Sequence, residues 1–120
     1  MADIYTDAGT GLTADILDGT AAVPTNWYIG WGTGAGVAAK ADTTLFTEAA
    51  EARVAATMTQ PAADTNQAVG TLTSASAQTI TNAGVLSALT GGILQLHSDF
   101  AGVALGINDS IQFTFKLQHT

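Results

Sequence analysis

Residues 111–118 read IQFTFKLQ, and this stretch indicates the fold more clearly than any other part of the chain. Its apolar residues Ile111, Phe113, Phe115 and Leu117 alternate with polar ones. Successive side chains of a β-strand point to opposite faces, so a period of two places all four on one face. The stretch therefore predicts a strand whose apolar face lies in a hydrophobic core.

Further strand-like runs lie on the N-terminal side of this stretch, with glycine, asparagine or proline between them. The runs cover residues 26–31, 52–60, 67–74, 79–83, 85–89 and 93–100. Strands that recur at such short intervals are typical of antiparallel sandwiches and barrels rather than of alternating α/β folds. We therefore predict an all-β fold, an antiparallel β-sandwich or a jelly-roll-like barrel.

The first 25 residues have a different composition, rich in Thr, Ala, Gly and Asp. A helical turn is expected at residues 13–17, but the capping signal is incomplete because Ile16 stands where an acid is preferred after Thr13. We predict an extended N-terminal arm over residues 1–25, which orders against a neighbouring subunit, and a β-sandwich domain over residues 26–120. A short helix and a loop are equally compatible with residues 43–50.

The overall composition excludes several classes of protein. The 120 residues form one domain, and only 11% of them are charged, against about 25% in an average soluble domain. Three basic residues and a net charge of −7 argue against nucleic-acid binding, which depends on basic side chains. The sequence contains no long apolar stretch that predicts a membrane span, no cysteine and no pattern of a signal peptide.

Motifs for catalysis and cofactor binding are weak throughout. The spacing Gly30-x-Gly32-x-x-Ala35 fits a loose dinucleotide fingerprint, but Gly34 and Gly36 interrupt the helix that should follow. No serine lies in a nucleophile motif. The cluster Glu48, Glu51 and Arg53 is best interpreted as a local surface ion pair. We therefore expect no catalytic residue and no cofactor.

Metal binding is also poorly supported. His97 and Asp99 are two residues apart on the polar face of an expected strand, as metal ligands can be, but no third ligand accompanies them. His119 lies next to the C-terminus, and the acids of the N-terminal segment lack the spacing of a calcium loop. We interpret His97 and Asp99 as part of an exposed polar strand face.

Aromatic residues gather at Trp27, Tyr28 and Trp31. They are expected in the core or at a subunit interface, where Trp and Tyr are enriched, and the alternative is a platform for stacking a sugar. Together with apolar residues of the N-terminal segment they form the set of interface candidates. This set is Trp27, Tyr28, Trp31, Ile4, Tyr5, Leu12, Ile16 and Leu17.

Several short motifs also occur together between residues 27 and 118. They are Tyr28-Ile29-Gly30-Trp31-Gly32-Thr33-Gly34, Asp42-Thr43-x-Leu45, Thr47-Glu48, Ala52-Arg53-Val54, Val69-Gly70-Thr71-Leu72, Ile80-Thr81-Asn82-Ala83-Gly84, Gly91-Gly92-x-Leu94 and Asp109-Ser110-Ile111-Gln112-Phe113-Thr114. In this pattern the chain resembles a group of small structural proteins of tailed-bacteriophage virions, with Val85 in place of an expected aromatic residue or leucine. The resemblance implies a virion protein and does not distinguish head, tail and fibre.

These observations lead to one expected function and several alternatives. We expect a capsid decoration (cement) protein on the outer surface of the shell, bound to the major capsid protein and assembled as a homo-oligomer, most simply a trimer. Small side chains and few charges suit such close subunit contacts. The main alternative is a tail-fibre or receptor-binding head domain with a glycan-stacking site, followed by a free carbohydrate-binding module and then an enzyme.

Overall fold

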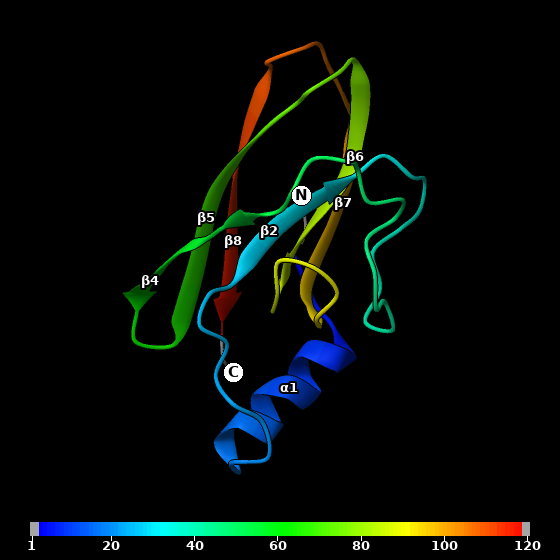
Figure 1. The fold of residues 1–120 in the computed structure, drawn as a ribbon. Coiled ribbons are helices and arrows are strands. Elements are labelled where there is room, and N and C mark those ends of the chain that lie inside the picture. The colour runs from blue at the N-terminus through cyan, green and yellow to red at the C-terminus, as the bar shows by residue number, and fades with distance from the viewer. Residues whose placement is uncertain (1–2, 119–120) are drawn as a thin grey trace.

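The computed structural model describes residues 3–118, which form eight strands and one helix (Figure 1). The elements are β1 (Ile4–Tyr5), α1 (Asp7–Leu17), β2 (Tyr28–Gly32), β3 (Val54–Ala55), β4 (Thr57–Ala62), β5 (Thr65–Thr73), β6 (Gln78–Leu86), β7 (Leu94–Leu105) and β8 (Ser110–Gln118). The helix α1 lies at one end of the strands, and the turn between β7 and β8 lies at the other.

The strands form two antiparallel sheets. One sheet has the order β1-β7-β6-β2-β3, and the other has the order β4-β5-β8. The predicted strand at 52–60 is divided between them, because β3 pairs with β2 and β4 pairs with β5. The prediction of an all-β antiparallel sandwich is confirmed, and the body is elongated, with extents of 44 × 25 × 25 Å.

The core lies between the two sheets and is built as the alternation in β8 predicts. Phe113, Phe115 and Leu117 are buried, whereas the polar residues between them are exposed. Phe113 contacts Trp31 of the opposite sheet edge to face, with ring centroids 6.3 Å apart. Each buried aromatic side chain of this kind contributes about 1.5–3 kcal/mol to stability, so this contact between β8 and β2 is central to the sandwich.

The other face of the five-stranded sheet is covered by residues 33–50, which contain no helix. Glycines on the sheet make this close approach feasible, since a Cβ at Gly32 would collide with the Phe46 carbonyl. The Asn82 side chain fixes the segment by accepting a hydrogen bond from the Phe46 N–H and donating one to the Phe46 carbonyl, both 3.0 Å long. We name residues 33–50 the covering segment.

His97 lies beneath the covering segment and is fully buried. Its Nδ1 is 2.8 Å from Asp42 Oδ2, and its Nε2 is 3.1 Å from Asn82 Oδ1. The expected exposed polar face at His97 is therefore wrong. A period of two separates the faces of a strand, but it does not show that a distant loop covers the polar face.

The N-terminal segment also differs from the expected extended arm, because residues 4–17 form β1 and α1 on the sheet. The helix begins at a Thr6 cap, whose Oγ1 accepts a hydrogen bond from the Gly9 N–H at 2.9 Å. Leu12 is buried, and β1 pairs with Leu96 and His97 of β7. The cap is seven residues before the Thr13 considered from the sequence, and the division of the chain at residue 25 stays a prediction.

No helix within residues 3–118 is long and apolar enough to cross a membrane.

Candidate functional site

A pocket of about 350 Å³ lies at the helical end of the sandwich, between α1 and the two sheets. It is lined by Thr13, Ile16, Trp27, Met58, Asn66, Ala68, Val85, Gln95, Leu96, Phe115 and Leu117. Ala68, Val85, Leu96 and Phe115 are buried, whereas Met58 is 42% exposed. The pocket therefore has a buried apolar floor and a partly exposed rim, and we name it the terminal pocket.

Gln95 is the polar residue of special interest in this pocket. Only 8% of its surface is exposed, and its Oε1 is a buried acceptor without a hydrogen-bond partner within residues 3–118. Its Nε2 donates a long hydrogen bond of 3.5 Å to Thr13 Oγ1. Nothing in the sequence indicated that helix α1 would enclose Gln95.

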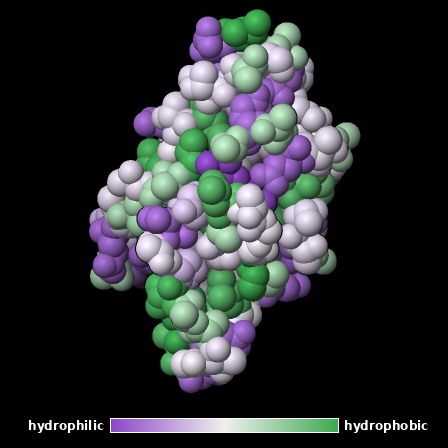
Figure 2. Space-filling view, viewed as in Figure 1, coloured by the Kyte–Doolittle hydropathy of each residue, from purple (hydrophilic) through white to green (hydrophobic). Residues whose placement is uncertain are grey.

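The surface around the helical end is apolar as well. Figure 2 shows green, hydrophobic side chains gathered over α1 and the chain that follows it. Leu17 at the end of α1 is 84% exposed, and Val23 is also exposed. Asp18 follows α1 directly, and hydrogen bonds from the Thr20 side chain and backbone lower the pKa of its carboxyl.

The interface candidates from the sequence are divided by the structure. Trp27 and Ile16 both line the terminal pocket. Leu17, the residue after Ile16, is exposed. Trp31, by contrast, is only 1% exposed and lies in the core, so it offers no surface for a sugar or a subunit.

The remaining candidates are buried or partly buried. Leu12 is buried, and Ile4, Tyr5 and Tyr28 are partly buried. The Tyr5 hydroxyl is 2.6 Å from Thr13 Oγ1, so this side chain fastens β1 to α1.

A second apolar surface lies between β7 and β8, where the two sheets face each other at one side of the sandwich. A groove of about 220 Å³ there is lined by Phe100, Val103, Ile111, Gln112, Phe113 and Thr114. Within residues 3–118, β8 pairs along one edge only, with β5. β7 pairs along one edge with β6, and along its other edge with β1 at only two residues. We name this surface the edge groove. Its residue Val103 is 39% exposed and was not among the interface candidates selected from the sequence.

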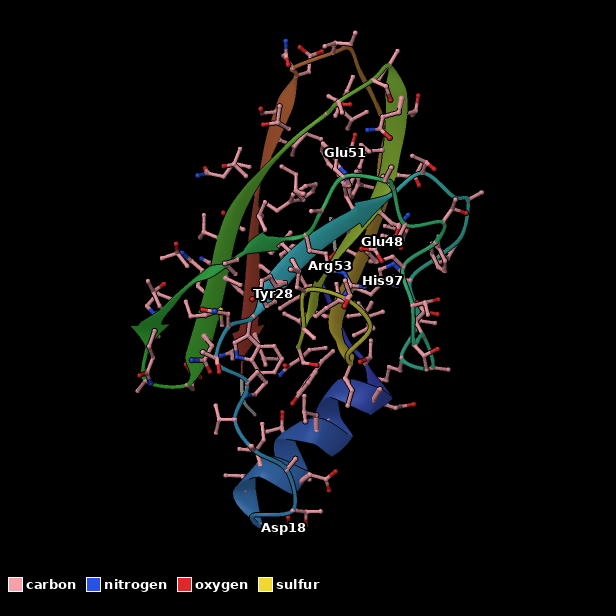
Figure 3. All side chains as sticks on the ribbon, viewed as in Figure 1. Asp18, Tyr28, Glu48, Glu51, Arg53 and His97 are labelled. Carbon is pink, nitrogen blue, oxygen red and sulfur yellow. The ribbon has the colours of Figure 1, made fainter. Side chains whose placement is uncertain are left out.

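The charged cluster at Glu48 and Arg53 is more buried than a surface ion pair. Figure 3 shows the two side chains next to each other beside β2. Arg53 Nε lies 2.7 Å from Glu48 Oε2, and only 9% of the Arg53 side chain is exposed. Its Nη1 donates to the carbonyls of Ala88 and Gly91, so Arg53 holds the β6–β7 turn rather than a ligand.

Glu51 belongs to a separate set of contacts near the opposite end from α1 (Figure 3). Its carboxylate accepts hydrogen bonds from Trp31 Nε1, the Ala75 N–H and Gln78 Nε2, at 3.2, 2.9 and 2.9 Å. Burial raises the pKa of Glu51, but the hydrogen bonds outweigh burial and the net pKa is lowered. Glu51 therefore acts as an ionised link between β2, the β5–β6 connection and the start of β6.

The potential metal ligands that the sequence offered are not brought together in the part of the chain that the structure describes. No group of three potential metal ligands occurs within residues 3–118. His97 contacts Asp42 and Asn82, and Asp99 accepts a hydrogen bond from the Ala38 N–H, so the two residues have separate partners. His119 lies outside the described residues.

Comparison with known proteins identifies the family. The family model described as "Podophage GP4 fiber I protein gp80" matches residues 8–119. A search of curated proteins found no match. Because the family match spans most of the chain, the chain belongs to the podophage GP4 fiber I protein gp80 family and is a structural protein of a tailed-phage virion.

Proposed function

We propose that the chain is a subunit of a virion fibre and that it contacts further copies of itself there. The observation that carries this proposal is the family match over residues 8–119, because the description of that family names a fibre protein. The fibre was the alternative in the sequence analysis, and it now takes precedence over a decoration protein bound to the major capsid protein.

The shape and surface of the molecule support a structural role. The body is nearly twice as long as it is wide, at 44 × 25 × 25 Å, which suits a module in an elongated assembly. Apolar side chains line two separate surfaces, the terminal pocket and the edge groove. Exposed apolar patches of this kind are typical of protein–protein contacts.

The edge groove is the better candidate for contact between copies. It lies where β7 and β8, the last strands of the sequence, leave part of their edges unpaired within residues 3–118. Unpaired strand edges beside apolar side chains favour association with another chain. A homo-oligomer, with a trimer as the simplest form for a fibre, is part of the proposal.

Trp31, one of the residues on which the glycan-stacking hypothesis depends, is not accessible to a sugar. Trp31 is enclosed in the core and packs on Phe113, so it cannot stack on a sugar without unfolding of the sandwich. Trp27 lines the terminal pocket, where the other lining side chains are mainly apolar. We therefore propose a structural fibre subunit without assigning it a glycan platform.

The number of copies per virion tests this proposal. Quantitative mass spectrometry of purified particles, with the major capsid protein as internal standard, should find a few to a few dozen copies of the chain. Hundreds of copies would contradict the fibre and support capsid decoration, because a shell offers a binding position on every capsomer.

A further inference from the structure

His97 of β7 is a fully buried ionisable residue, and both of its ring nitrogens face oxygen atoms (Figure 3). Nδ1 lies 2.8 Å from Asp42 Oδ2, and Nε2 lies 3.1 Å from Asn82 Oδ1. The ring also packs on Phe46 of the covering segment, with ring centroids 4.6 Å apart. We name His97, Asp42 and Asn82 the histidine cluster. The charge of the ring depends on which of its nitrogens carry hydrogen.

The orientation of the Asn82 amide settles the state of one nitrogen. Asn82 Oδ1 accepts a hydrogen bond from the Phe46 N–H, and Asn82 Nδ2 donates one to the Phe46 carbonyl. Exchanging the two amide atoms would place donor against donor and acceptor against acceptor. Asn82 Oδ1 is therefore an acceptor, and the His97 Nε2 next to it must carry a hydrogen.

Asp42 requires a hydrogen on the other nitrogen as well. Its Oδ2 lies 2.8 Å from His97 Nδ1 and also accepts the Ala39 N–H at 2.8 Å. A bare Nδ1 would place its lone pair against a carboxylate oxygen, which is unfavourable in a buried site. An imidazole is a stronger base than a carboxylate, so the shared proton belongs to the ring. The hydrogen bonds thus give His97 a positive charge, which Asp42 neutralises.

The other charged residues around the ring have different partners or are exposed. Within residues 3–118, Asp42 is the charged side chain that is hydrogen-bonded to His97. At the neighbouring strand positions, β6 presents the neutral Asn82 and β1 presents Ile4. Asp99, two residues along β7, is hydrogen-bonded to a backbone N–H of the covering segment. The remaining charged residues of the adjoining elements are Asp3, bound to Ser98 and Lys116, Glu48, bound to Arg53, and the exposed Asp7 and Lys40.

We propose that the His97–Asp42 pair is a pH-sensitive lock that holds the covering segment on the five-stranded sheet. With both ring nitrogens protonated, Nδ1 donates to Asp42 and the segment is fastened. The folded chain then binds a proton that the unfolded chain releases more readily, so the lock weakens as pH rises and the ring becomes neutral. In acid, protonation of Asp42 removes the negative charge, so the lock is strongest at intermediate pH.

Loosening of the lock has a structural consequence. Leu45 of the covering segment packs with the buried Leu86 and Leu94 of the sheet. When the segment loosens, these two side chains become accessible on a face of the sheet that is otherwise covered. The inference is independent of the fibre proposal, because it concerns a single chain.

NMR of the His97 ring tests the assigned charge. The chain has two histidines, so His119→Gln leaves His97 as the source of all imidazole signals. At neutral pH, ¹⁵N-edited spectra of this variant should show hydrogen on both ring nitrogens. Hydrogen on one ring nitrogen alone at neutral pH would overturn the proposal.

Hydrogen exchange over the same pH series tests the lock itself. The Ala39 and Phe46 N–H groups donate to side chains of the histidine cluster. Their protection factors, corrected for the intrinsic dependence of exchange on pH, should fall about tenfold when His97 loses its proton, as loss of one hydrogen bond to a charged group would give. The amide of the buried Phe115 in β8 should keep its protection.

Two variants that each remove one negative charge complete the test. Asp42→Asn should abolish the pH-dependent step at Phe46, because an asparagine amide can accept from a protonated Nδ1 or donate to a bare one. Asp15→Asn, at an exposed position of α1, should retain the step. Protection at Phe46 that is unchanged by loss of the His97 proton would overturn the proposal, and so would a step that Asp42→Asn retains. If Asp42→Asn does not fold, exchange in the wild-type protein still decides.

Discussion

At the scale of single residues, polar side chains join parts of the chain that are far apart in sequence. Glu51 links Trp31 of β2 to Ala75 in the β5–β6 connection and to Gln78 at the start of β6. Arg53 links Glu48 to the carbonyls of Ala88 and Gly91. The two residues occupy one short segment but stabilise different ends of the strands, so their effects should be separable by mutation.

The lowered pKa of Glu51 predicts how acid acts on the protein. A carboxyl whose pKa is lower in the folded state stabilises the fold above its ordinary pKa of 4.5, and this contribution is lost as pH falls through the folded value. Glu51→Gln should lower the free energy of unfolding by about 1 kcal/mol at pH 7 and by less in acid. Urea denaturation at pH 7 and at lower pH measures the difference.

Asp15→Asn is the control for this experiment, because Asp15 is an exposed carboxyl on α1. It should follow the wild-type dependence on pH. A Glu51→Gln variant whose deficit stays constant or grows in acid would contradict the assignment of Glu51 as an ionised link.

At the scale of elements, the helix α1 depends on a close approach to β7. A Cβ added at Gly9 would lie 2.7 Å from the Gln95 Cα, whereas a Cβ at Gly11 would meet nothing within 4 Å. Gly9→Ala should therefore destabilise the protein by about 1–3 kcal/mol. Gly11→Ala should stabilise it by about 0.5–1 kcal/mol, because alanine favours the helix.

Thermal unfolding monitored by circular dichroism compares these two glycine variants directly. The same substitution in the same helix has opposite effects only if α1 packs on β7. Equal changes in Tm for Gly9→Ala and Gly11→Ala would mean that α1 is not docked there and would restore the extended arm.

The apolar face of β8 provides the corresponding test of the core. Phe113→Ala should lower the free energy of unfolding by about 3–5 kcal/mol, because it opens a cavity between Trp31, Phe100 and Phe115. Thr114→Ala, at an exposed position on the same strand, should change it by less than about 0.5 kcal/mol. Comparable losses in urea denaturation would argue against the alternation in β8.

The sequence predicts elements better when their signal is local. The alternation in β8 identified its buried face because one strand carries both the pattern and its consequence. The burial of His97 was missed because it depends on the covering segment, whose Asp42 lies 55 residues earlier in the chain. The glycines between 30 and 36 were weighed as a loose dinucleotide fingerprint, whereas in the structure Gly32 is needed for close packing against Phe46.

The candidate site was only partly accessible from the sequence. Trp27 was selected as one of three clustered aromatic residues and Ile16 as an apolar residue of the N-terminal segment, and both line the terminal pocket. Gln95 and Val103 were missed, because their importance arises from the position of α1 and from unpaired strand edges. Trp31 was selected by type, although a tryptophan in the core and one at an interface give the same local pattern.

At the scale of the whole molecule, the edge groove predicts how copies associate. Val103→Asp places a charge in the groove and should shift the protein toward the monomer, with at least a tenfold weaker association constant. Val37→Asp changes an exposed valine of the covering segment and should leave association unchanged. Sedimentation velocity at micromolar concentration measures both, and an oligomer that tolerates Val103→Asp would place the contact elsewhere.

In the proposed function, this elongated β-sandwich belongs to a fibre of the virion. Gold-labelled antibodies raised against the purified chain, applied to intact phage particles and viewed by electron microscopy, test it most directly. If the chain is a fibre subunit, the gold should be confined to fibres that project from the particle. Gold distributed evenly over the capsid shell would contradict it and identify the chain as a decoration protein.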